Sequence, residues 1–398
     1  MSLQLACPDG SFEALEQAGV KFGVADNRII IPVPFLGEDG EAHRGYLVDP
    51  LHIMGDGSVG LPSNHQMYFA GGTPHELDGR TMLPVLGEGA GNNYPVFGGA
   101  VAQYYFSYKI RANGHNREYV SLAEKVVHYF RTISAPVEHK FPGTVKAMVD
   151  VDIESDYDPP FKFPDAHSAA AGLDNYNIPL KELTVGLIGV GGTGSYILDF
   201  LVKTPVRKIR VFDADDFEVK TSFRSPGSSN VTEFDRPKVE VYRDRYGTFR
   251  EGLEFHSVRI NSSNVEMVSD CDFIFLAIDN GISRRELTSL FDSRELTYID
   301  VGMGLERADD GLFGMVRTTF VSDETRQVVQ QQNAIPFADA DQEQYLTNIQ
   351  IAEWIALTAA IAVIRFKSHF GFYADDVGFF RHIIPSRRMS AITSKIPS

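Results

Sequence analysis

The stretch Thr184–Ser195, TVGLIGVGGTGS, decides the fold of this chain. Its apolar residues run into the glycine-rich segment Gly189–Gly194, and a pattern of apolar residues at helical spacing begins at Tyr196. This order predicts a buried strand, a glycine-rich turn and a helix. Glycines permit unusual φ values in such a turn and let a phosphate come close. The helix that follows directs its unpaired N–H groups at that phosphate, so the stretch indicates a nucleotide site without saying which nucleotide.

Strands and helices alternate along the rest of this half of the chain. After Leu183 the expected order is TVGLIGV, a helix from Ser195, KIRVFDA, a helix from about Arg236, FIFLAI, a helix from about Ser283, and LTYIDVGM. This alternation predicts an α/β fold with a doubly wound, Rossmann-like, mostly parallel sheet. FGMVRTTFV follows a short turn, so we expect it to pair antiparallel, and VGFFRHII is expected to be the last strand. The helix NIQIAEWIALTAAIAVIRFK, from Asn348, is apolar nearly all round, which predicts burial or a subunit interface.

The first part of the chain has a different pattern. Residues 1–149 are predicted to form a separate β-rich N-terminal α+β domain, with short strands between glycine and acidic turns. A helix capped by Ser11 opens this domain, and the helix VSLAEKVVHYFRTI closes it, with Ser121 and Glu124 at the spacing of a capping box. Residues 150–180 are acidic and contain prolines, which favours a linker. Residues 181–398 then form the nucleotide-binding domain.

Composition excludes several classes of function. The 398 residues carry a net charge of −16, which repels phosphates and makes nucleic acid an unlikely partner class on electrostatic grounds. No apolar run is long enough to cross a bilayer and no secretory leader is seen, so we expect a cytoplasmic protein without a membrane partner. The two cysteines, Cys7 and Cys271, provide neither a disulfide framework nor a zinc-binding pair. Seven of the eleven histidines are scattered through residues 1–149, and we interpret them as structural or surface residues.

Charged residues beyond the glycine turn restrict the choice of nucleotide. Asp213 ends the second strand, where a dinucleotide fold places an acid on the ribose, but an NAD dehydrogenase would share it. Arg224 and Lys238 would be poor partners for an uncharged nicotinamide, whereas they suit the phosphates of ATP. Asp279 follows the third strand, where a carboxylate facing a triphosphate would serve as a Mg²⁺ ligand. Together these side chains suit adenylyl transfer, in which a carboxylate attacks the α-phosphate and pyrophosphate leaves.

The same motifs carry a family resemblance. GVGGTGS, VFDADDFEV, FR, RPKVE, LAIDNGISRR and IDVGMG, in this order over roughly residues 180–385, resemble the ThiF/MoeB/ubiquitin-activating enzyme family. The resemblance implies that the nucleotide is held by Gly189, Gly191, Gly192 and Gly194, with Asp213 on the ribose and Asp215 at the same strand end. It also implies that Arg224 and Lys238 contact the phosphates and that Asp279 coordinates Mg²⁺. The N-terminal half resembles a domain fused to such activating domains in bacterial operons that encode ubiquitin-like proteins.

The sequence also departs from the family pattern. Thr221 stands where the family usually has asparagine, and residues 165–180 lack the arginine that many members supply to the phosphates. The zinc-binding cysteine pairs of MoeB-like members are missing. Thioester-forming members carry a nucleophilic cysteine in the loop before the long helix, and the corresponding loop, Ser322–Tyr345, has none. Because a thiolate is the stronger nucleophile at neutral pH, its loss changes the expected mechanism.

The sequence therefore predicts a ThiF-family adenylyltransferase that uses ATP and Mg²⁺. Its expected substrate is the C-terminal glycine of a bacterial ubiquitin-like protein, and the acyl group passes on without a thioester on a loop cysteine. A conjugating-enzyme-like protein is a possible acceptor, and the family implies a homodimer. Three alternatives stay open at this point: a non-catalytic scaffold of the same fold, an NAD-dependent oxidoreductase, and adenylation of a short peptide or small carboxylate.

Overall fold

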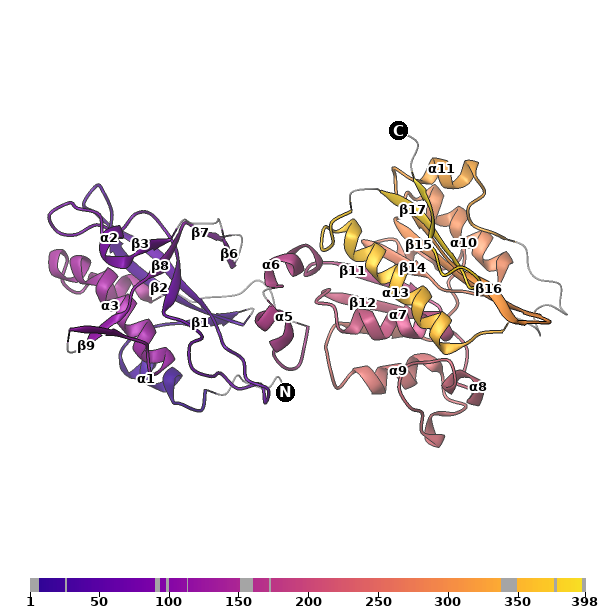
Figure 1. Cartoon of the computed structure of the whole chain (residues 1–398), viewed down its shortest axis with the longest axis horizontal. Helices are drawn as coiled ribbons and strands as arrows, with labels where there is room; N and C mark the ends of the chain where they lie inside the picture. The colour runs from indigo at the N-terminus through magenta and orange to yellow at the C-terminus, as the bar shows by residue number, and fades with distance from the viewer. Residues whose placement is uncertain are drawn as a thin grey trace. The chain divides into compact units, whose positions relative to one another are not determined.

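The computed structural model describes residues 7–25, 27–89, 94–97, 100–112, 114–150, 160–171, 173–337, 349–375 and 378–395. The chain divides into two compact units, which are described separately: Met1–Pro159 with Phe163–Asn175, and Pro160–Lys162 with Tyr176–Ser398. The predicted limits at residues 149 and 181 stay predictions. Residues 151–159 of the predicted linker lie outside the described residues. Its later part contains the short helices α5 (Ala166–Ala171) and α6 (Asp174–Asn177) (Figure 1).

The carboxyl-terminal unit is built on an eight-stranded sheet with the order β13-β12-β11-β14-β15-β16-β17-β18 (Figure 1). Its first five strands pair in parallel, and β16, β17 and β18 add antiparallel. The predicted doubly wound, mostly parallel α/β fold is thereby confirmed. The strands are β11 (Thr184–Ile188), β12 (Lys208–Phe212), β13 (Leu253–His256), β14 (Phe273–Leu276), β15 (Tyr298–Ala308), β16 (Gly311–Val321), β17 (Phe379–Pro385) and β18 (Ile392–Lys395).

Helices cover both faces of this sheet. The helices α7 (Gly192–Val202), α9 (Lys238–Tyr246) and α13 (Ala352–His369) share one apolar core with the sheet. The helices α10 (Gly281–Ser293) and α11 (Arg326–Gln331) share a second core on the other face. The helix α13 buries Ile355, Ala359 and Phe366 and contacts α7, β15 and β16, as its apolar sequence predicts. The predicted start of this helix, Asn348, lies outside the described residues.

Two strands of the sheet are missing from the sequence-based prediction. β13 has the sequence LEFH and β18 has the sequence ITSK, and both lie at the sheet's edges. A short edge strand buries few side chains, so it lacks the apolar run by which β11 and β14 are recognised. The predicted antiparallel hairpin is confirmed, since Ala308 pairs with Gly311 across the turn between β15 and β16. A single turn of helix, α8 (Val219–Ser222), follows β12.

The amino-terminal unit is β-rich, as predicted. Its six-stranded sheet has the order β1-β2-β3-β4-β8-β5, and two-stranded ribbons β6–β7 and β9–β10 accompany it. The helices α1, α3 and α4 share the main core of the unit with the sheet, whereas a smaller cluster lies around Ile30 and Val48. The strands are β1 (Gly23–Ala25), β2 (Arg28–Leu36), β3 (Ala42–Pro50), β4 (Gln66–Ala70), β5 (Glu88–Gly89), β6 (Tyr94–Phe97), β7 (Ala100–Ala102), β8 (Tyr104–Ser107), β9 (Ile110–Ala112) and β10 (His115–Arg117), and the helices are α1 (Ser11–Gln17), α2 (Leu83–Leu86), α3 (Leu122–Lys140) and α4 (Thr144–Val149).

Helix capping in this unit differs in detail from the prediction. Ser11 is not the cap of α1, because Gly10 holds that position and the Asp9 carboxylate accepts from the backbone N–H of Ser11 at 2.9 Å. Ser121 does cap α3, and its hydroxyl accepts from the backbone N–H of Glu124 at 3.0 Å. The Glu124 carboxylate, however, accepts from the N–H of Val120, one residue before the position that a capping box requires.

Candidate active site

The glycine turn between β11 and α7 is too tight for any other residue at two positions. Gly189 has a φ of +89°, and a Cβ at this position would overlap the carbonyl oxygen of Ala277. A Cβ on Gly194 would overlap the carbonyl oxygen of Gly189. At Gly191, in contrast, nothing among the described residues lies within 4 Å of the place of a Cβ. The turn is therefore closed against the segment after β14 and open at Gly191, whereas a Cβ on Gly192, the first residue of α7, would meet Ile355.

Asp213 connects this turn to the end of β12. One oxygen of its carboxylate accepts from the backbone N–H of Val190 at 2.8 Å, and the other accepts from the N–H of Asp215 at 2.8 Å. The residue is buried. The sequence assigns Asp213 to a ribose, and the structure adds a second role, because this carboxylate holds the glycine turn in place.

Lys238 opens α9 and extends toward the same strand end. Its Nζ lies 3.0 Å from the carboxylate of Asp215 and 3.5 Å from that of Asp213. Arg259, which the sequence reasoning missed, places Nη2 3.0 Å from the other oxygen of Asp215. Burial acts to raise the pKa of Asp215, but the hydrogen bonds and charges of Lys238 and Arg259 outweigh it and lower this pKa below its ordinary value. Asp213, Asp215 and Lys238 thus form one ionic cluster beside the turn.

Arg224 lies beside the first residue of α7. Its Nη1 donates to Oε1 of Gln350 at 2.7 Å, and this oxygen and the backbone carbonyl of Arg224 both border the place of a Cβ on Gly192. Its Nε is buried and has no hydrogen-bond partner within the described part of the chain. A buried cationic donor without a partner is costly, and the Nε atoms of Arg365 and Arg381 are in the same state. Gln350 has no role in the sequence-based prediction of the site.

Asp279 follows β14 at the same edge of the sheet. Ala277, two residues before it, donates its N–H to the carbonyl of Ile188 at 2.9 Å, which holds this segment against the turn. Asp279 itself is exposed, and Asn280 caps α10 by accepting from the N–H of Ser283 at 2.8 Å. The described residues contain no group of three or more His, Cys, Asp or Glu side chains that could hold a metal ion by themselves.

A cluster of buried charges supports this edge from within the sheet. Asp300 on β15 is fully buried, with one oxygen 3.0 Å from Nε of Arg284 and the other 2.5 Å from Nη2 of Arg317. Arg284 also donates to the carbonyl of Ile278, the residue before Asp279. The sequence reasoning missed this cluster, since nothing in the spacing of these three residues indicates that they meet.

Comparison with known proteins identifies the carboxyl-terminal half. The sequence model of the ThiF family matches residues 170–364. These residues are a ThiF family domain. A second match, to a domain of unknown function (DUF6791), covers residues 11–166 and hence most of the amino-terminal half.

The relatives of the ThiF domain include ubiquitin-like modifier-activating enzyme 5 of Drosophila willistoni, 24% identical over 151 residues that cover 35% of this chain and 37% of that protein. The enzyme 5 of Branchiostoma floridae is 23% identical over 158 residues, covering 36% and 38%. The match therefore spans little more than a third of these relatives' length. Among solved structures, Escherichia coli MccB with ATP has a TM-score of 0.45 at 14% identity, covering 58% of this chain and 69% of that one. PaaA has a TM-score of 0.44 at 18% identity, covering 58% and 80%.

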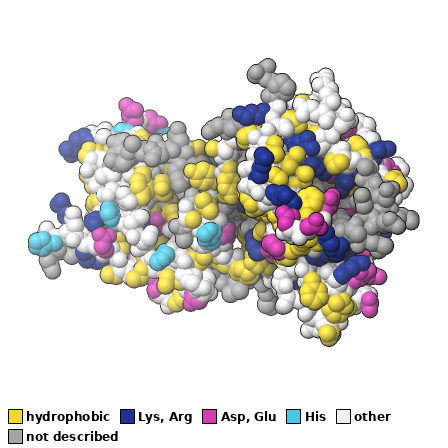
Figure 2. Space-filling model, turned by 45° about the vertical axis from the view of Figure 1, so that its right-hand side comes forward, with side chains coloured by type: hydrophobic (Ala, Val, Ile, Leu, Met, Phe, Trp, Pro, Cys, Tyr) yellow, Lys and Arg dark blue, Asp and Glu magenta, His cyan; other side chains and the backbone are white. Residues whose placement is uncertain are grey.

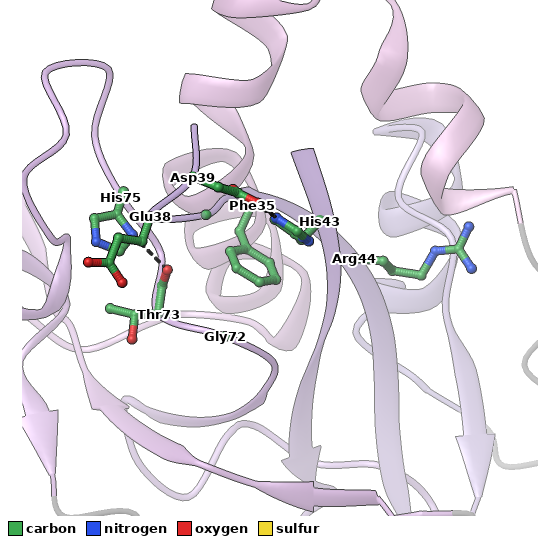
Figure 3. A pocket seen from close by; sticks show the side chains of 9 residues that line it. Phe35, Glu38, Asp39, His43, Arg44, Gly72, Thr73 and His75 are labelled. Atoms are coloured by element: carbon green, nitrogen blue, oxygen red, sulfur yellow. Dashed lines mark hydrogen bonds and ion pairs between the residues drawn. The ribbon is translucent and has the colours of Figure 1, made fainter. Parts of the chain in front are cut away.

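The amino-terminal unit has a hollow of its own beside β2. A cavity of about 650 Å³ lies over Phe35 and is bordered by polar side chains, among them His43, Thr73 and His75 (Figure 3). His75 is buried and its Nδ1 lies 2.9 Å from the carbonyl oxygen of Thr73. His43 places Nε2 3.0 Å from the carboxylate of Asp39. Both histidines have partners within the unit, in keeping with their interpretation as structural or surface residues.

Two further observations concern the charged side chains on the surface and the apolar character of the helices. On the face drawn in Figure 2, Lys and Arg side chains of the ThiF domain lie among Asp and Glu side chains and apolar ones, not in one separate field. Within the described residues, none of the helices has both the length and the apolar character that crossing a membrane requires.

Proposed function

We propose that this chain is an adenylyltransferase that uses ATP to activate a C-terminal carboxylate, with the terminal glycine of a bacterial ubiquitin-like protein as substrate. The observation that supports the proposal is a guanidinium beside the glycine turn, because Arg224, whose carbonyl borders Gly192, donates to Gln350 next to the same glycine. A helix start and a guanidinium together suit a phosphate group. Both features would also suit the pyrophosphate of NAD, so they do not by themselves separate ATP from a dinucleotide. The ThiF family match over residues 170–364 favours ATP.

Each of the other site residues has a role in this proposal. Gly189, Gly191, Gly192 and Gly194 let the nucleotide approach the backbone. Asp213 and Asp215 would lie at the ribose end, and Lys238, which pairs with both carboxylates, would contact the phosphates. The exposed carboxylate of Asp279 fits Mg²⁺, which proteins often bind through one or two carboxylates together with substrate phosphates. When bound, Mg²⁺ would stabilise the charge that builds up on the leaving pyrophosphate.

The acyl group is expected to leave this chain without forming a thioester on it. Burial, followed by the hydrogen bond to Asp9, raises the pKa of the Cys7 thiol to about 11. Burial raises the pKa of Cys271 to about 12. Thiols with such values are almost entirely protonated at neutral pH and are therefore weak nucleophiles. The acceptor would be the nucleophile of a conjugating-enzyme-like partner, an amine or a hydroxyl.

We further propose that the amino-terminal unit docks the partner or the modifier, and that the protein forms a homodimer and acts in the cytoplasm.

Pyrophosphate exchange tests the proposal. The full-length chain, supplied with ATP, Mg²⁺ and a ubiquitin-like protein that ends in glycine, should exchange labelled pyrophosphate into ATP. The same modifier without its terminal glycine should give only the background rate, because no carboxylate would then be correctly placed. Stable binding of the modifier with no exchange would support a non-catalytic scaffold instead. Exchange with short peptides but not with the folded modifier would change the substrate class.

The two cysteines supply a separate prediction. In the Cys7→Ala and Cys271→Ala double variant, the exchange rate should stay within about twofold of the wild-type rate, because exchange reports formation of the adenylate, in which no thiol takes part. The melting temperature serves as the control, since Cys271 is buried against Gly186. Any adduct of the modifier with the wild-type chain should resist thiol reductants. An adduct that reductants remove, and that the double variant fails to form, would show a thioester on this chain.

A further inference from the structure

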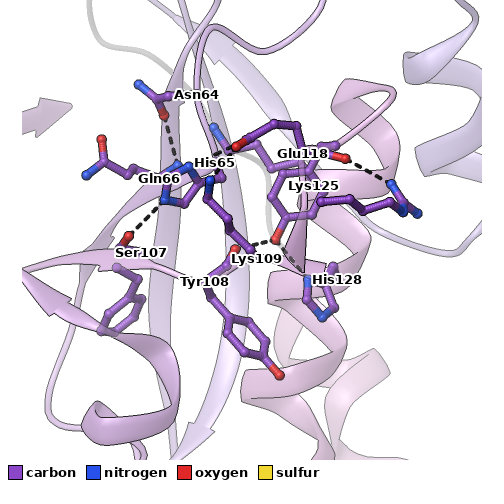
Figure 4. Close-up of polar contacts among 12 residues, drawn as sticks. Asn64, His65, Gln66, Ser107, Tyr108, Lys109, Glu118, Lys125 and His128 are labelled. Carbon is purple, nitrogen blue, oxygen red and sulfur yellow. Dashed lines mark hydrogen bonds and ion pairs between the residues drawn. The ribbon is translucent and has the colours of Figure 1, made fainter. Parts of the chain in front are cut away.

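A serine, a histidine and a glutamate lie in line where strand β8 ends and strand β4 begins (Figure 4). Ser107 ends β8 and is exposed, and His65 immediately precedes β4, whose first residue pairs with Ser107 across the sheet. The His65 Nε2 lies 2.9 Å from Oγ of Ser107. On the other side of the ring, Nδ1 lies 3.5 Å from the carboxylate of Glu118. Nucleophilic serines in acyl-transfer enzymes are activated by this order of hydroxyl, imidazole and carboxylate.

The protonation state of His65 suits a general base. A carboxylate beside Nδ1 favours the tautomer with hydrogen on that nitrogen, which leaves Nε2 to accept from the serine hydroxyl. Burial lowers the pKa of His65, as do the positive charges of Lys109 and Lys125, against the opposing effect of Glu118. Because the pKa lies below its ordinary value, the ring is neutral at pH 7 and can take up a proton.

Buried contacts hold this group in place. Lys109 pairs with Glu118 and so restrains the carboxylate. The Tyr129 hydroxyl, on the buried face of α3, donates to the carbonyl of His65 at 2.8 Å and accepts from the N–H of Tyr108 at 2.7 Å. The backbones on both sides of the Ser107–His65 contact are therefore anchored to one core residue. Chance surface contacts between two flexible side chains lack such support.

We propose that Ser107 is the nucleophile of an acyl-ester hydrolase site in the amino-terminal unit, an activity additional to adenylation. Its Oγ would attack the carbonyl carbon of a carboxylic ester while Nε2 of His65 takes the hydroxyl proton. The C–O bond to the alcohol breaks, and the alcohol leaves with that proton, which gives an acyl-serine. Water, deprotonated by the same imidazole, then hydrolyses the acyl-serine, releases the carboxylic acid and restores Ser107.

The surroundings of Ser107 also predict how fast this site works. The backbone N–H of Ser107 donates to the carbonyl of Gly87 at 2.9 Å, and the N–H of Tyr108 donates to Tyr129. Neither is available to stabilise the oxyanion of a tetrahedral intermediate, and the loss of one such donor lowers rates by about a hundredfold to a thousandfold. Turnover should therefore be slow, which makes covalent labelling of the serine a better measurement than product formation.

The test is reaction of the full-length chain with a fluorophosphonate probe, in which the serine oxygen displaces fluoride from phosphorus. Mass spectrometry should find the label on Ser107. Ser107→Ala should remove it, and His65→Gln should slow it by about a hundredfold, the contribution of a general base. Ser58→Ala is the matched control, because Ser58 is a half-buried serine whose hydroxyl donates to Asp56, and it should not change the rate. An unlabelled Ser107, or an unchanged rate in folded His65→Gln, would overturn the proposal.

Glu118→Gln tests the third member as a positioning residue. Labelling should become slower, and the midpoint of its rise with pH should move to lower pH, because Glu118 raises the pKa of His65 while Lys109 and Lys125 lower it. A purely structural role of Glu118 would change the rate without moving this midpoint. An unmoved midpoint would thus remove Glu118 from the proposed site.

Discussion

Asp279→Ala should lower the rate of ATP–pyrophosphate exchange by about a hundredfold to a thousandfold or more, the usual effect of removing one group that stabilises transition-state charge. Asp279 follows β14 at the edge where the glycine turn opens, and its neighbours Ala277 and Ile278 contact Gly189. A carboxylate at this place would act through Mg²⁺ on the phosphates. Because the side chain is exposed and stands just before the start of α10, the substitution should change the free energy of unfolding by no more than about 1 kcal/mol. Exchange should therefore fall far more than this small change in stability could explain.

A second aspartate in the same domain supplies the control for that experiment. Asp309 is exposed in the turn between β15 and β16, so Asp309→Ala removes the same charge at a different place. Exchange by this variant should equal that of the wild type, which separates a local effect from a change of net charge. Full exchange by Asp279→Ala would refute the Mg²⁺ assignment, although the wild-type exchange would still support adenylation. No exchange by the wild-type chain would refute adenylation itself.

The parts of the site that the sequence predicts are those set by local sterics. Gly189 and Gly194 are glycines because a Cβ would overlap a carbonyl oxygen, so their spacing is visible in the sequence itself. The apolar runs of β11 and β14 are equally local, since both strands are buried throughout. Parallel pairing of β12, β11 and β14 then brings the residues that follow these three strands to the same end of the sheet. Asp213 and Asp279 could be placed at this end for that reason.

The partner of a charged side chain could not be predicted in the same way. Lys238 was expected on phosphates, and the structure shows it between two carboxylates that precede it by more than twenty residues. Gln350, the partner of Arg224, is 126 residues away along the chain. Such pairs depend on how segments that are distant in the sequence pack together, and the periodicity of the sequence does not indicate them. The same limit applies to Ser107 and His65, which meet only because β8 pairs with β4.

Arg317→Leu should have the largest effect on stability. Asp300 is fully buried, and the loss of the Arg317 guanidinium, 2.5 Å away, would leave one of its oxygens without its charged partner. Breaking a buried ion pair from one side costs about 3–5 kcal/mol. For a domain of this size each kcal/mol lowers the melting temperature by about 2–4 °C, so we expect a decrease of roughly 6–20 °C. Arg294→Leu is the matched control, because its pair with Glu266 is exposed and should contribute less than about 1 kcal/mol.

The buried cluster also connects stability with the site. Arg284 joins Asp300 to the carbonyl of Ile278, directly before Asp279. After the loss of Arg317, Asp300 keeps the guanidinium of Arg284, which should shift toward it and release that carbonyl, so Arg317→Leu should also slow pyrophosphate exchange at a temperature at which the variant is folded. Adding Asp300→Asn to Arg317→Leu should lower the melting temperature further, because the buried Arg284 guanidinium then loses its carboxylate partner, and it should not restore exchange. A melting temperature of Arg317→Leu equal to that of Arg294→Leu would show that the cluster contributes no more than a surface pair.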